Sequence, residues 1–408
     1  MVPSGVRQAL QLVAALLALA AHANALHAAD AADPSADHEQ QLVAAIQEIL
    51  ARDGPYSPEL LGPLTALIEL YHEEENDALA AVTIERARQI VRVNDGLYAL
   101  EQVPYIEQLI RIERARGNHT TAWDLQQDLL ALVRRYPEDL RAVSVLREDA
   151  ERHMDLLALY LHGERPPELY LGCYYGGDCV SGQRSEVVQG MIADARRSYL
   201  EAIAVLLRNE LYDSDELREL EVEVLRGLDM VRTRFGDGFG TGTYNFGRQR
   251  LHRLYEYDAA ASRPALSQAN AAVQIADWEL LHSNNGEAVD RYAFVVATLQ
   301  KLGATQASID ELFLPELPVV LPAFQPNPLA RDESKRATGY VDAAFEITKY
   351  GRGRAVEILD AANATRDDKN RLVSLIMLNR FRPRPTNDEF VGDSRVVVRY
   401  YLYDGARD

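Results

Sequence analysis

The helical architecture of this chain follows from LTALIELYHEEENDALAAVTIERA at residues 64–87 and IEQLIRIERARGNHTTAWDLQQDL at residues 106–129. In both segments apolar residues recur at intervals of three and four, which is the periodicity of an amphipathic helix. The two segments lie 42 residues apart, and the pairs that keep this spacing are Leu67–Leu109, Ile68–Ile110, Ala80–Ala122, Gly54–Gly96 and Tyr56–Tyr98. Such a repeat predicts stacked helical hairpins, in which each unit buries its apolar face against its neighbours.

At these residues the chain resembles the tetratricopeptide repeat family. That family places a small residue where the two helices of a hairpin approach most closely, and Ala80 and Ala122 stand at this position. A third, looser match comprises Ile275-Ala276, Ala288 and Tyr292. The period is longer than the roughly 34 residues that are usual in the family. The resemblance implies an all-α array of helical hairpins over residues 39–313 that binds other proteins.

Two irregular segments interrupt the helical pattern. Residues 163–184 are predicted to form a long excursion, after which helices are expected over 186–210 and 213–234. The Gly-rich run that begins at Gly236 follows a helix and lacks the Gly-Lys-Ser/Thr ending of a phosphate-binding loop. We therefore expect a loop between helices there. Five prolines between 315 and 328 predict an extended linker over residues 314–338.

The N-terminus has the pattern of a signal peptide. Arg7 precedes an apolar run over residues 9–21, and Ala23-Asn24-Ala25 offers a cleavage site. The run of 13 residues would be about 20 Å long as a helix, against about 30 Å for a bilayer core. Removal of residues 1–25 and export to the periplasm are therefore favoured over retention as a membrane anchor. Residues 26–38 are predicted to be disordered.

The chain has two cysteines, Cys173 and Cys179, within the predicted excursion. In an oxidising compartment a close pair usually forms a disulfide, and we expect one here as a structural link. A redox or metal role is the alternative. It is less favoured because two cysteines without clustered histidines fall short of a four-ligand site.

Residues 339–408 predict a small α+β domain in the order strand, strand, helix, strand. Alternation over Tyr340–Thr348 indicates a half-buried strand, and a turn at Gly351 leads to a second strand over Arg354–Leu359. Thr365 and Asp368 predict a capping box. The buried stripe of the helix is predicted to be Leu372, Val373, Leu375 and Ile376, with Leu378 as a further candidate. A closing strand is expected over Arg395–Tyr403.

This order of residues resembles the C-terminal domain of the TonB family of energy transducers. The resemblance rests on Gly339-Tyr340-Val341, Phe345-Glu346-Ile347, Arg380-Phe381-Arg382-Pro383 and the closing strand, with Leu321–Pro326 as a Pro-containing lead-in. Members of that family pair an exposed sheet edge with a short segment of an outer-membrane transporter. The resemblance therefore implies a partner-binding edge on the closing strand, formed by Arg395, Val397, Arg399, Tyr401 and Tyr403. The alternative, that these aromatic side chains only pack on a neighbouring strand, is equally consistent with the sequence.

The charge of the chain restricts its partners. Of its 43 basic and 62 acidic residues, 15 and 13 lie in residues 331–408, which leaves 28 and 49 in residues 1–330. The net charge of −19 therefore resides in the helical part, and it argues against binding to nucleic acid or to anionic lipid surfaces. The histidines are scattered singly, so we expect no catalytic site, no metal and no cofactor, and no small-molecule substrate is evident.

These observations predict a non-catalytic periplasmic adaptor of the bacterial cell envelope. Its helical repeats would bind one protein and its C-terminal domain another, an outer-membrane protein being one candidate. The alternative is an atypical TonB-type energy transducer for outer-membrane transport, anchored in the inner membrane by residues 9–21.

Overall fold

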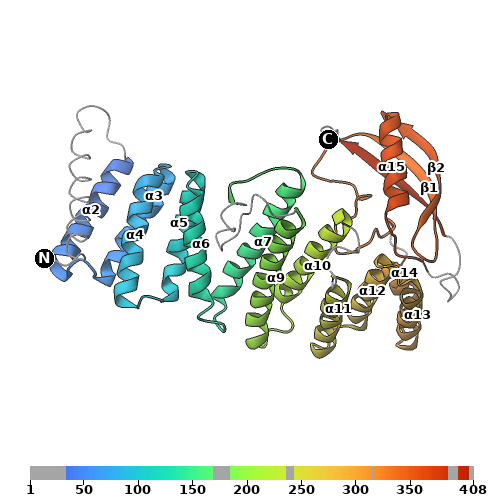
Figure 1. Ribbon diagram of the computed structural model, residues 1–408, viewed down its shortest axis with the longest axis horizontal. Coiled ribbons are helices and arrows are strands. Elements are labelled where there is room, and N and C mark those ends of the chain that lie inside the picture. The colour runs from blue at the N-terminus through green and yellow to red at the C-terminus, as the bar shows by residue number, and fades with distance from the viewer. Residues whose placement is uncertain (1–33, 169–183, 236–242, 314–315, 385–393, 404–408) are drawn as a thin grey trace. The chain divides into compact units, whose positions relative to one another are not determined.

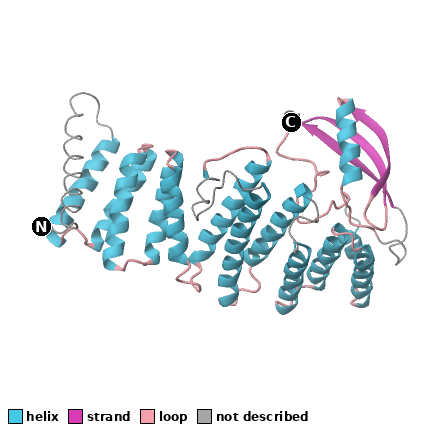
Figure 2. Ribbon diagram, in the orientation of Figure 1, coloured by secondary structure: helices cyan, strands magenta, loops and turns pink. Residues whose placement is uncertain are grey.

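The computed structural model describes residues 34–168, 184–235, 243–313, 316–384 and 394–403. The described chain is mostly helical and ends in a small three-stranded antiparallel sheet (Figure 1). Figure 2 shows that the strands of the described residues lie in the C-terminal part. The chain divides into two compact units, residues 1–132 and residues 133–408. The predicted order, a helical region followed by a ββαβ domain, is confirmed.

The first unit consists of helical hairpins around one apolar core. Ala80 is fully buried there beside Leu67, Ile68 and Tyr71, as the hairpin prediction requires. Two short 3-10 helices, Pro58–Leu60 and Leu100–Gln102, lead into the first helix of each hairpin. The helices of this unit are α2 (Pro34–Asp53), α3 (Leu61–Glu73), α4 (Asp77–Asn94), α5 (Val103–Ala115) and α6 (His119–Val133).

The hairpins α3–α4 and α5–α6 turn through the same backbone geometry. Glu75 and Gly117, which are 42 residues apart, both adopt the left-handed conformation, with φ of 53° and 75°. The amides of the next residues, Asn76 and Asn118, each donate at 2.8 Å to a carbonyl five residues earlier. This left-handed helix end is a Schellman-type turn. The repeat recognised in the sequence is therefore also a repeat of the backbone.

Helix α2 begins earlier than the sequence suggests. Residues 26–38 were predicted to be disordered, but Pro34 to His38 form the first turns of α2. Proline is well tolerated in the first turn, and Asp37 lies where the helix dipole favours an acidic side chain. Residues 26–33 and the predicted signal peptide lie outside the described residues.

The second unit continues the helical pattern and carries the sheet. Helix α7 packs on α9, and α12 packs on both α11 and α13. The helices predicted over 186–210 and 213–234 are present as α9 and α10. The helices of this unit that precede the sheet are α7 (Arg141–Leu161), α9 (Arg184–Arg208), α10 (Asp215–Phe235), α11 (Thr243–Ala260), α12 (Ala265–Leu281), α13 (Asn285–Lys301) and α14 (Gln306–Phe313).

The third, looser repeat match is the hairpin α12–α13. Ile275, Ala276, Ala288 and Tyr292 are at most 1% exposed. The turn between the two helices repeats the geometry of the first unit, since Ser283 has a φ of 67° and the amide of the following residue donates to the carbonyl of Glu279 at 2.9 Å. This hairpin forms the base on which the C-terminal sheet rests.

The C-terminal sheet has the order β2-β1-β3, with β1 (Ala337–Ile347) between β2 (Gly353–Ala362) and β3 (Ser394–Tyr403). Both neighbours pair with β1 in the antiparallel direction. Helix α15 (Arg366–Leu378) covers one face, where Leu372 and Ile376 pack on the buried side chains of the strands. The closing strand β3 is therefore an edge strand of the described sheet.

The predictions for helix α15 are confirmed for its capping box and for Leu372, Leu375 and Ile376, whereas Val373 is only half-buried and lies outside the core cluster. Thr365 and Asp368 form the predicted capping box, with the amide of Thr365 donating to Asp368 at 2.8 Å. Leu378 was proposed as part of the buried stripe, but it is 84% exposed. It is the last residue of the helix and lies beyond the edge of the core, so helical spacing alone overestimated the stripe.

The Pro-rich segment is packed against the C-terminal domain over much of its length. Val320 forms an antiparallel bridge with Phe381, and the amide of Leu321 donates to the carbonyl of Arg380 at 2.8 Å. Val320, Leu321 and Leu329 are each at most 5% exposed. This segment was predicted to be an extended linker, and instead it contributes side chains to the core of the α+β domain.

Candidate functional site

The predicted partner-binding residues lie on β3, which pairs with β1 along one side only in the described sheet. Each of them pairs with one residue of β1. The pairs are Arg395–Glu346, Val397–Ala344, Arg399–Asp342, Tyr401–Tyr340 and Tyr403–Ala337. Because β3 is an edge strand, its second row of backbone groups is available for pairing with another chain. The edge position was thus predicted from the sequence; its use by a partner is a proposal.

The face of the sheet opposite α15 is crossed by ion pairs. Arg399 donates to both carboxylate oxygens of Asp342, at 2.8 Å and 2.7 Å. Its hydrogen bond to Asp342 raises the pKa of Arg399, and the same bond lowers the pKa of Asp342. The guanidinium also lies over the ring of Tyr340, 4.1 Å from its centroid. Arg399 is therefore held in place by its own chain.

A second ion pair passes over the middle strand. Arg395 on β3 donates to Glu357 on β2 at 2.8 Å, although β1 runs between these two strands. Ala344 of β1 stands opposite Glu357 on one side and Val397 on the other, and it is only 1% exposed. A small side chain at this position leaves room for the pair to cross. Val397 itself is 60% exposed and is the apolar centre of this end of β3.

The two predicted tyrosines of β3 contact the Pro-rich segment. The hydroxyl of Tyr403 accepts a hydrogen bond from the amide of Asp332 at 2.7 Å. The guanidinium of Arg331 lies 5.2 Å from the centroid of the Tyr401 ring. Of the five predicted residues, Arg395, Arg399, Tyr401 and Tyr403 thus have contacts within the chain, and Val397 is the exposed apolar side chain among them.

The sheet is fixed to the helices by a buried ion pair that the sequence did not reveal. Arg382 donates to the two carboxylate oxygens of Asp277 at 3.1 Å and 2.6 Å, and to the carbonyl of Leu312 at 2.9 Å. Tyr292 donates its hydroxyl proton to the same carboxylate at 2.6 Å. Burial lowers the pKa of Arg382, but the charge of Asp277 and the hydrogen bond outweigh it, so the pKa is raised. Arg382 belongs to Arg380–Pro383, where only the family resemblance drew attention to it.

A glycine allows the hairpin turn to approach the helices closely. Gly351 has a φ of 68°, and a Cβ at this position would lie 2.3 Å from the carbonyl oxygen of Phe381 and 2.8 Å from a methyl group of Leu280 in α12. No other residue fits this contact without displacing backbone. The turn predicted at Gly351 therefore positions the sheet on α12.

The first unit offers an exposed apolar strip on two loops of the repeat. Tyr56, Leu97 and Tyr98 are 38%, 52% and 47% exposed, and Val93 at the end of α4 is 50% exposed. The guanidinium of Arg86 lies over the ring of Tyr56 at 5.5 Å. Because Tyr56 and Tyr98 are 42 residues apart, each repeat presents an aromatic side chain at the same place. This strip is the candidate binding surface of the helical repeats.

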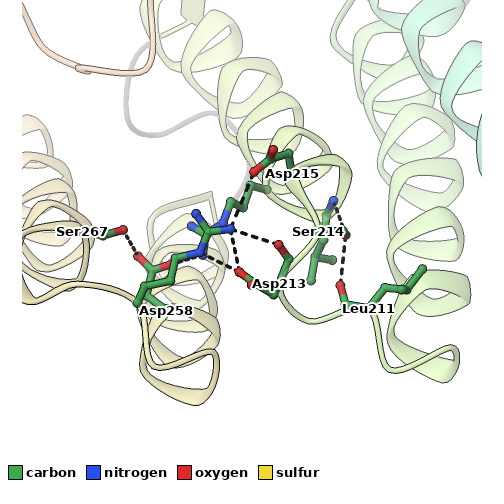
Figure 3. Close-up of polar contacts among 9 residues, drawn as sticks. Leu211, Asp213, Ser214, Asp215, Asp258 and Ser267 are labelled. Atoms are coloured by element: carbon green, nitrogen blue, oxygen red, sulfur yellow. Dashed lines mark hydrogen bonds and ion pairs between the residues drawn. The ribbon is translucent and has the colours of Figure 1, made fainter.

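The polar cluster in Figure 3 joins α10, α11 and α12. Arg263 contacts Asp213 at 2.6 Å, and Asp258 forms an ion pair with Arg218. The hydroxyl of Ser267 donates to Asp258 at 3.2 Å. Asp258 of α11 is thus engaged by α10 and α12, while Asp213 and Arg263 join the loops that precede α10 and α12, which suits a structural role in spacing the helices.

A second polar cluster contains a serine, a histidine and an aspartate. Ser198 donates to Asp149 at 2.6 Å, and His153 Nε2 lies 3.8 Å from the other oxygen of that carboxylate. Burial lowers the pKa of His153. A serine nucleophile needs its base on the hydroxyl group, with the carboxylate beyond the base. Here the serine and the histidine both meet the carboxylate, so these residues do not form that arrangement.

Other predicted features are not described by the structure. Cys173 and Cys179, with their predicted disulfide, and most of the Gly-rich loop fall outside the described residues. Among the residues that are described, no group of three or more His, Cys, Asp or Glu could hold a metal ion. A search of the described helices found none with the length and apolarity needed to cross a bilayer.

No protein-family model matches the chain, and no curated protein matches it. Two solved structures are similar to part of it, and both are described as crystal structures of Podosopora anserina putative kinesin light chain nearly identical TPR-like repeats. One of them, a form with a single substitution, is 14% identical, covers 60% of this chain and 97% of its own, and has a TM-score of 0.33. The other is 13% identical, covers 61% and 99%, and has the same TM-score of 0.33.

Proposed function

We propose that this protein is a non-catalytic adaptor that binds other proteins through its helical repeats and through the β3 edge of its C-terminal sheet. The observation that supports the proposal most directly is the position of β3, an edge strand with the exposed Val397 near its centre. Strand addition at such an edge gains affinity from backbone hydrogen bonds and selectivity from side chains. The exposed strip on the repeats serves a second protein.

The compartment we propose is the periplasm, reached through removal of residues 1–25. The partners are then proteins of the bacterial cell envelope, with an outer-membrane protein as the candidate for β3. The proposal draws on the cleavable pattern at residues 9–25 and on the TonB-like residue order of the C-terminal domain. An energy transducer anchored by residues 9–21 is the second candidate. Alkali washing of membranes separates the two, because an adaptor is released as a shortened chain and a transducer stays in the membrane.

Deleting the C-terminal domain is a poor test of the β3 edge. Removal of residues 339–408 also removes Arg382, which leaves the buried carboxylate of Asp277 without its cation. Loss of a buried partner is strongly destabilising. Any loss of binding after that deletion would therefore be confounded by unfolding of α12–α14.

A single charge on the edge is a cleaner test. We expect Val397→Asp to abolish capture of the envelope partner, because a charged side chain opposes pairing at an edge strand. Leu359→Asp is the matched control, since Leu359 is 47% exposed on β2, the opposite edge of the same sheet. If both variants capture the partner as well as the wild type, β3 is not the binding edge.

A further inference from the structure

Two arginines of the second unit face one another across a β-bridge. Arg352, in the turn between β1 and β2, pairs in the antiparallel direction with Arg380, just after α15. Residues directly opposite in an antiparallel pair have Cβ atoms about 4.5–5.5 Å apart and project to the same face. The backbone therefore places the side chains of Arg352 and Arg380, each with a guanidinium group, next to one another.

Neither arginine forms an ion pair with a carboxylate of the described residues. Arg380 donates to the carbonyl of Tyr350 at 2.6 Å, and Arg352 is exposed. A third arginine, Arg232 near the end of α10, is close enough to repel Arg380, although Asp229 neutralises it at 2.7 Å. The pKa of Arg380 is lowered, first by burial and then by the charges of Arg352 and Arg232.

This arrangement differs from that of the other arginines of the same sheet. Arg354, Arg395 and Arg399 each have a carboxylate partner, at 3.1 Å, 2.8 Å and 2.7 Å. In a chain with a net charge of −19, acidic side chains are plentiful. Like charges directly opposite one another destabilise a strand pair. Within the described residues the charges of this pair are therefore uncompensated, and a bound anion would relieve their repulsion.

We propose that Arg352 and Arg380 form a binding site for one oxyanion, a carboxylate or a phosphate. The planar guanidinium matches the geometry of both groups and donates two parallel hydrogen bonds to either. The acidic helical part of the chain repels extended polyanions, which disfavours nucleic acid and anionic membranes and leaves a small or singly charged ligand.

The backbone at this site is fixed before any ligand arrives. The amide of Gly351 donates to the carbonyl of Thr348 at 2.8 Å, and the amide of Phe381 donates to the carbonyl of Gly351 at 2.8 Å. The amide of Arg352 also donates to the hydroxyl of Thr348 at 3.1 Å. Since the backbone already aligns the two arginines, binding of an anion would order only the ends of their side chains.

The test uses the full chain with sodium phosphate or sodium acetate, balanced with sodium chloride to constant ionic strength. Isothermal titration and thermal unfolding measure binding. We expect the wild type to bind at least one of the two anions and to gain in Tm. Arg352→Gln should weaken binding about tenfold or more, because it removes the charge and the paired donors that make such hydrogen bonds strong. Arg354→Gln, which alters a paired arginine nearby, should leave binding unchanged.

Each outcome has a clear meaning. Binding of acetate alone identifies a carboxylate ligand, and binding of phosphate alone identifies a phosphate ligand. Arg380→Gln provides a second variant, and it also loses the contact with Tyr350, so Arg352→Gln is the cleaner one. The proposal would be overturned if the wild type and Arg352→Gln bound the anion equally well, or if Arg354→Gln weakened anion binding as much as Arg352→Gln does. It would also be overturned if the protein bound anionic lipid vesicles and neither small anion. The site is separate from β3, so Val397→Asp should bind the anion normally.

Discussion

Arg382 and Asp277 are 105 residues apart in the sequence and form a two-point ion pair in which both side chains are at most 5% exposed. The pair joins the C-terminal α+β domain to α12 of the helical region. Tyr292 shares the carboxylate, and its own pKa is raised well above the usual value by burial and by Asp277. The hydroxyl therefore stays protonated at neutral pH and donates to the carboxylate.

We expect Arg382→Met to lower the free energy of unfolding by about 3–5 kcal/mol, because Asp277 would remain buried without its cation. Urea unfolding monitored by circular dichroism measures the change. Arg399→Met is the control, since it breaks an exposed two-point pair and should have a much smaller effect. The double variant Asp277→Leu/Arg382→Met should recover part of the loss, because it removes the buried charge but also the acceptor of the Tyr292 hydroxyl. If Arg382→Met lowers the free energy of unfolding no more than Arg399→Met does, the buried ion pair does not have this stabilising role.

The stability of the helical region should depend on the ionisation of Glu221. This side chain is fully buried on α10, and burial raises its pKa to about 7, despite Arg250 at 3.4 Å. A carboxyl group with a raised pKa in the folded state keeps its proton longer when folded than when unfolded. Protonated Glu221 therefore favours the folded state. This contribution to the free energy of unfolding is full below about pH 4.5 and is lost as the pH rises to about 7.

Over this window the free energy of unfolding should fall by an amount on the order of 3 kcal/mol because of Glu221. Denaturation at several pH values should show a flatter profile for Glu221→Gln than for the wild type. Glu216→Gln, an exposed change earlier in the same helix, serves as the control. Parallel pH profiles for wild type and Glu221→Gln would rule out Glu221 as the source.

Gly247 should be intolerant of any side chain. A Cβ at this position of α11 would lie 2.3 Å from Cζ2 of Trp278, which is itself 1% exposed. We expect Gly247→Ala to destabilise the protein by about 1–3 kcal/mol through overpacking. Gly190 in α9 has open space around it, so Gly190→Ala should instead stabilise by about 0.5–1 kcal/mol. Thermal unfolding of both variants should show shifts of Tm in opposite directions.

The repeat turn permits a matched pair of substitutions. Glu75 and Gly117 occupy equivalent left-handed positions, and only glycine is free of strain there. We expect Glu75→Gly to stabilise and Gly117→Ala to destabilise, each by about 1 kcal/mol. Nothing lies within 4 Å of a Cβ at Gly117, so its effect would be purely conformational. Thermal unfolding measures both changes. If Tm shifts in the same direction in Glu75→Gly and Gly117→Ala, the two turns are not equivalent.

The parts of the fold that the sequence predicted are those that depend on local pattern. Helical spacing placed Leu67 and Ala80 in the core, and the capping box at Thr365 marked the start of α15. Alternation placed β3, and its edge position followed from the family resemblance. The helical spacing, the capping box and the alternation each depend on residues only a few positions apart.

The features that were missed depend on contacts distant in the sequence. Nothing near Asp277 indicates that a basic residue 105 positions later will neutralise it. The prolines after residue 314 correctly excluded helix, but their spacing does not reveal that Val320 would pair with Phe381. The bridge between Arg352 and Arg380 likewise arises only when the hairpin turn meets the segment after α15.

The packing of Val320 and Leu329 into the α+β core has a consequence for how this domain can be re-engineered. A C-terminal fragment that begins at Gly339 and is fused to another protein would lack part of its own hydrophobic core and would expose Phe381. The smallest transferable piece begins before Val320 and still carries Arg382, which needs an acidic counterpart on its new host.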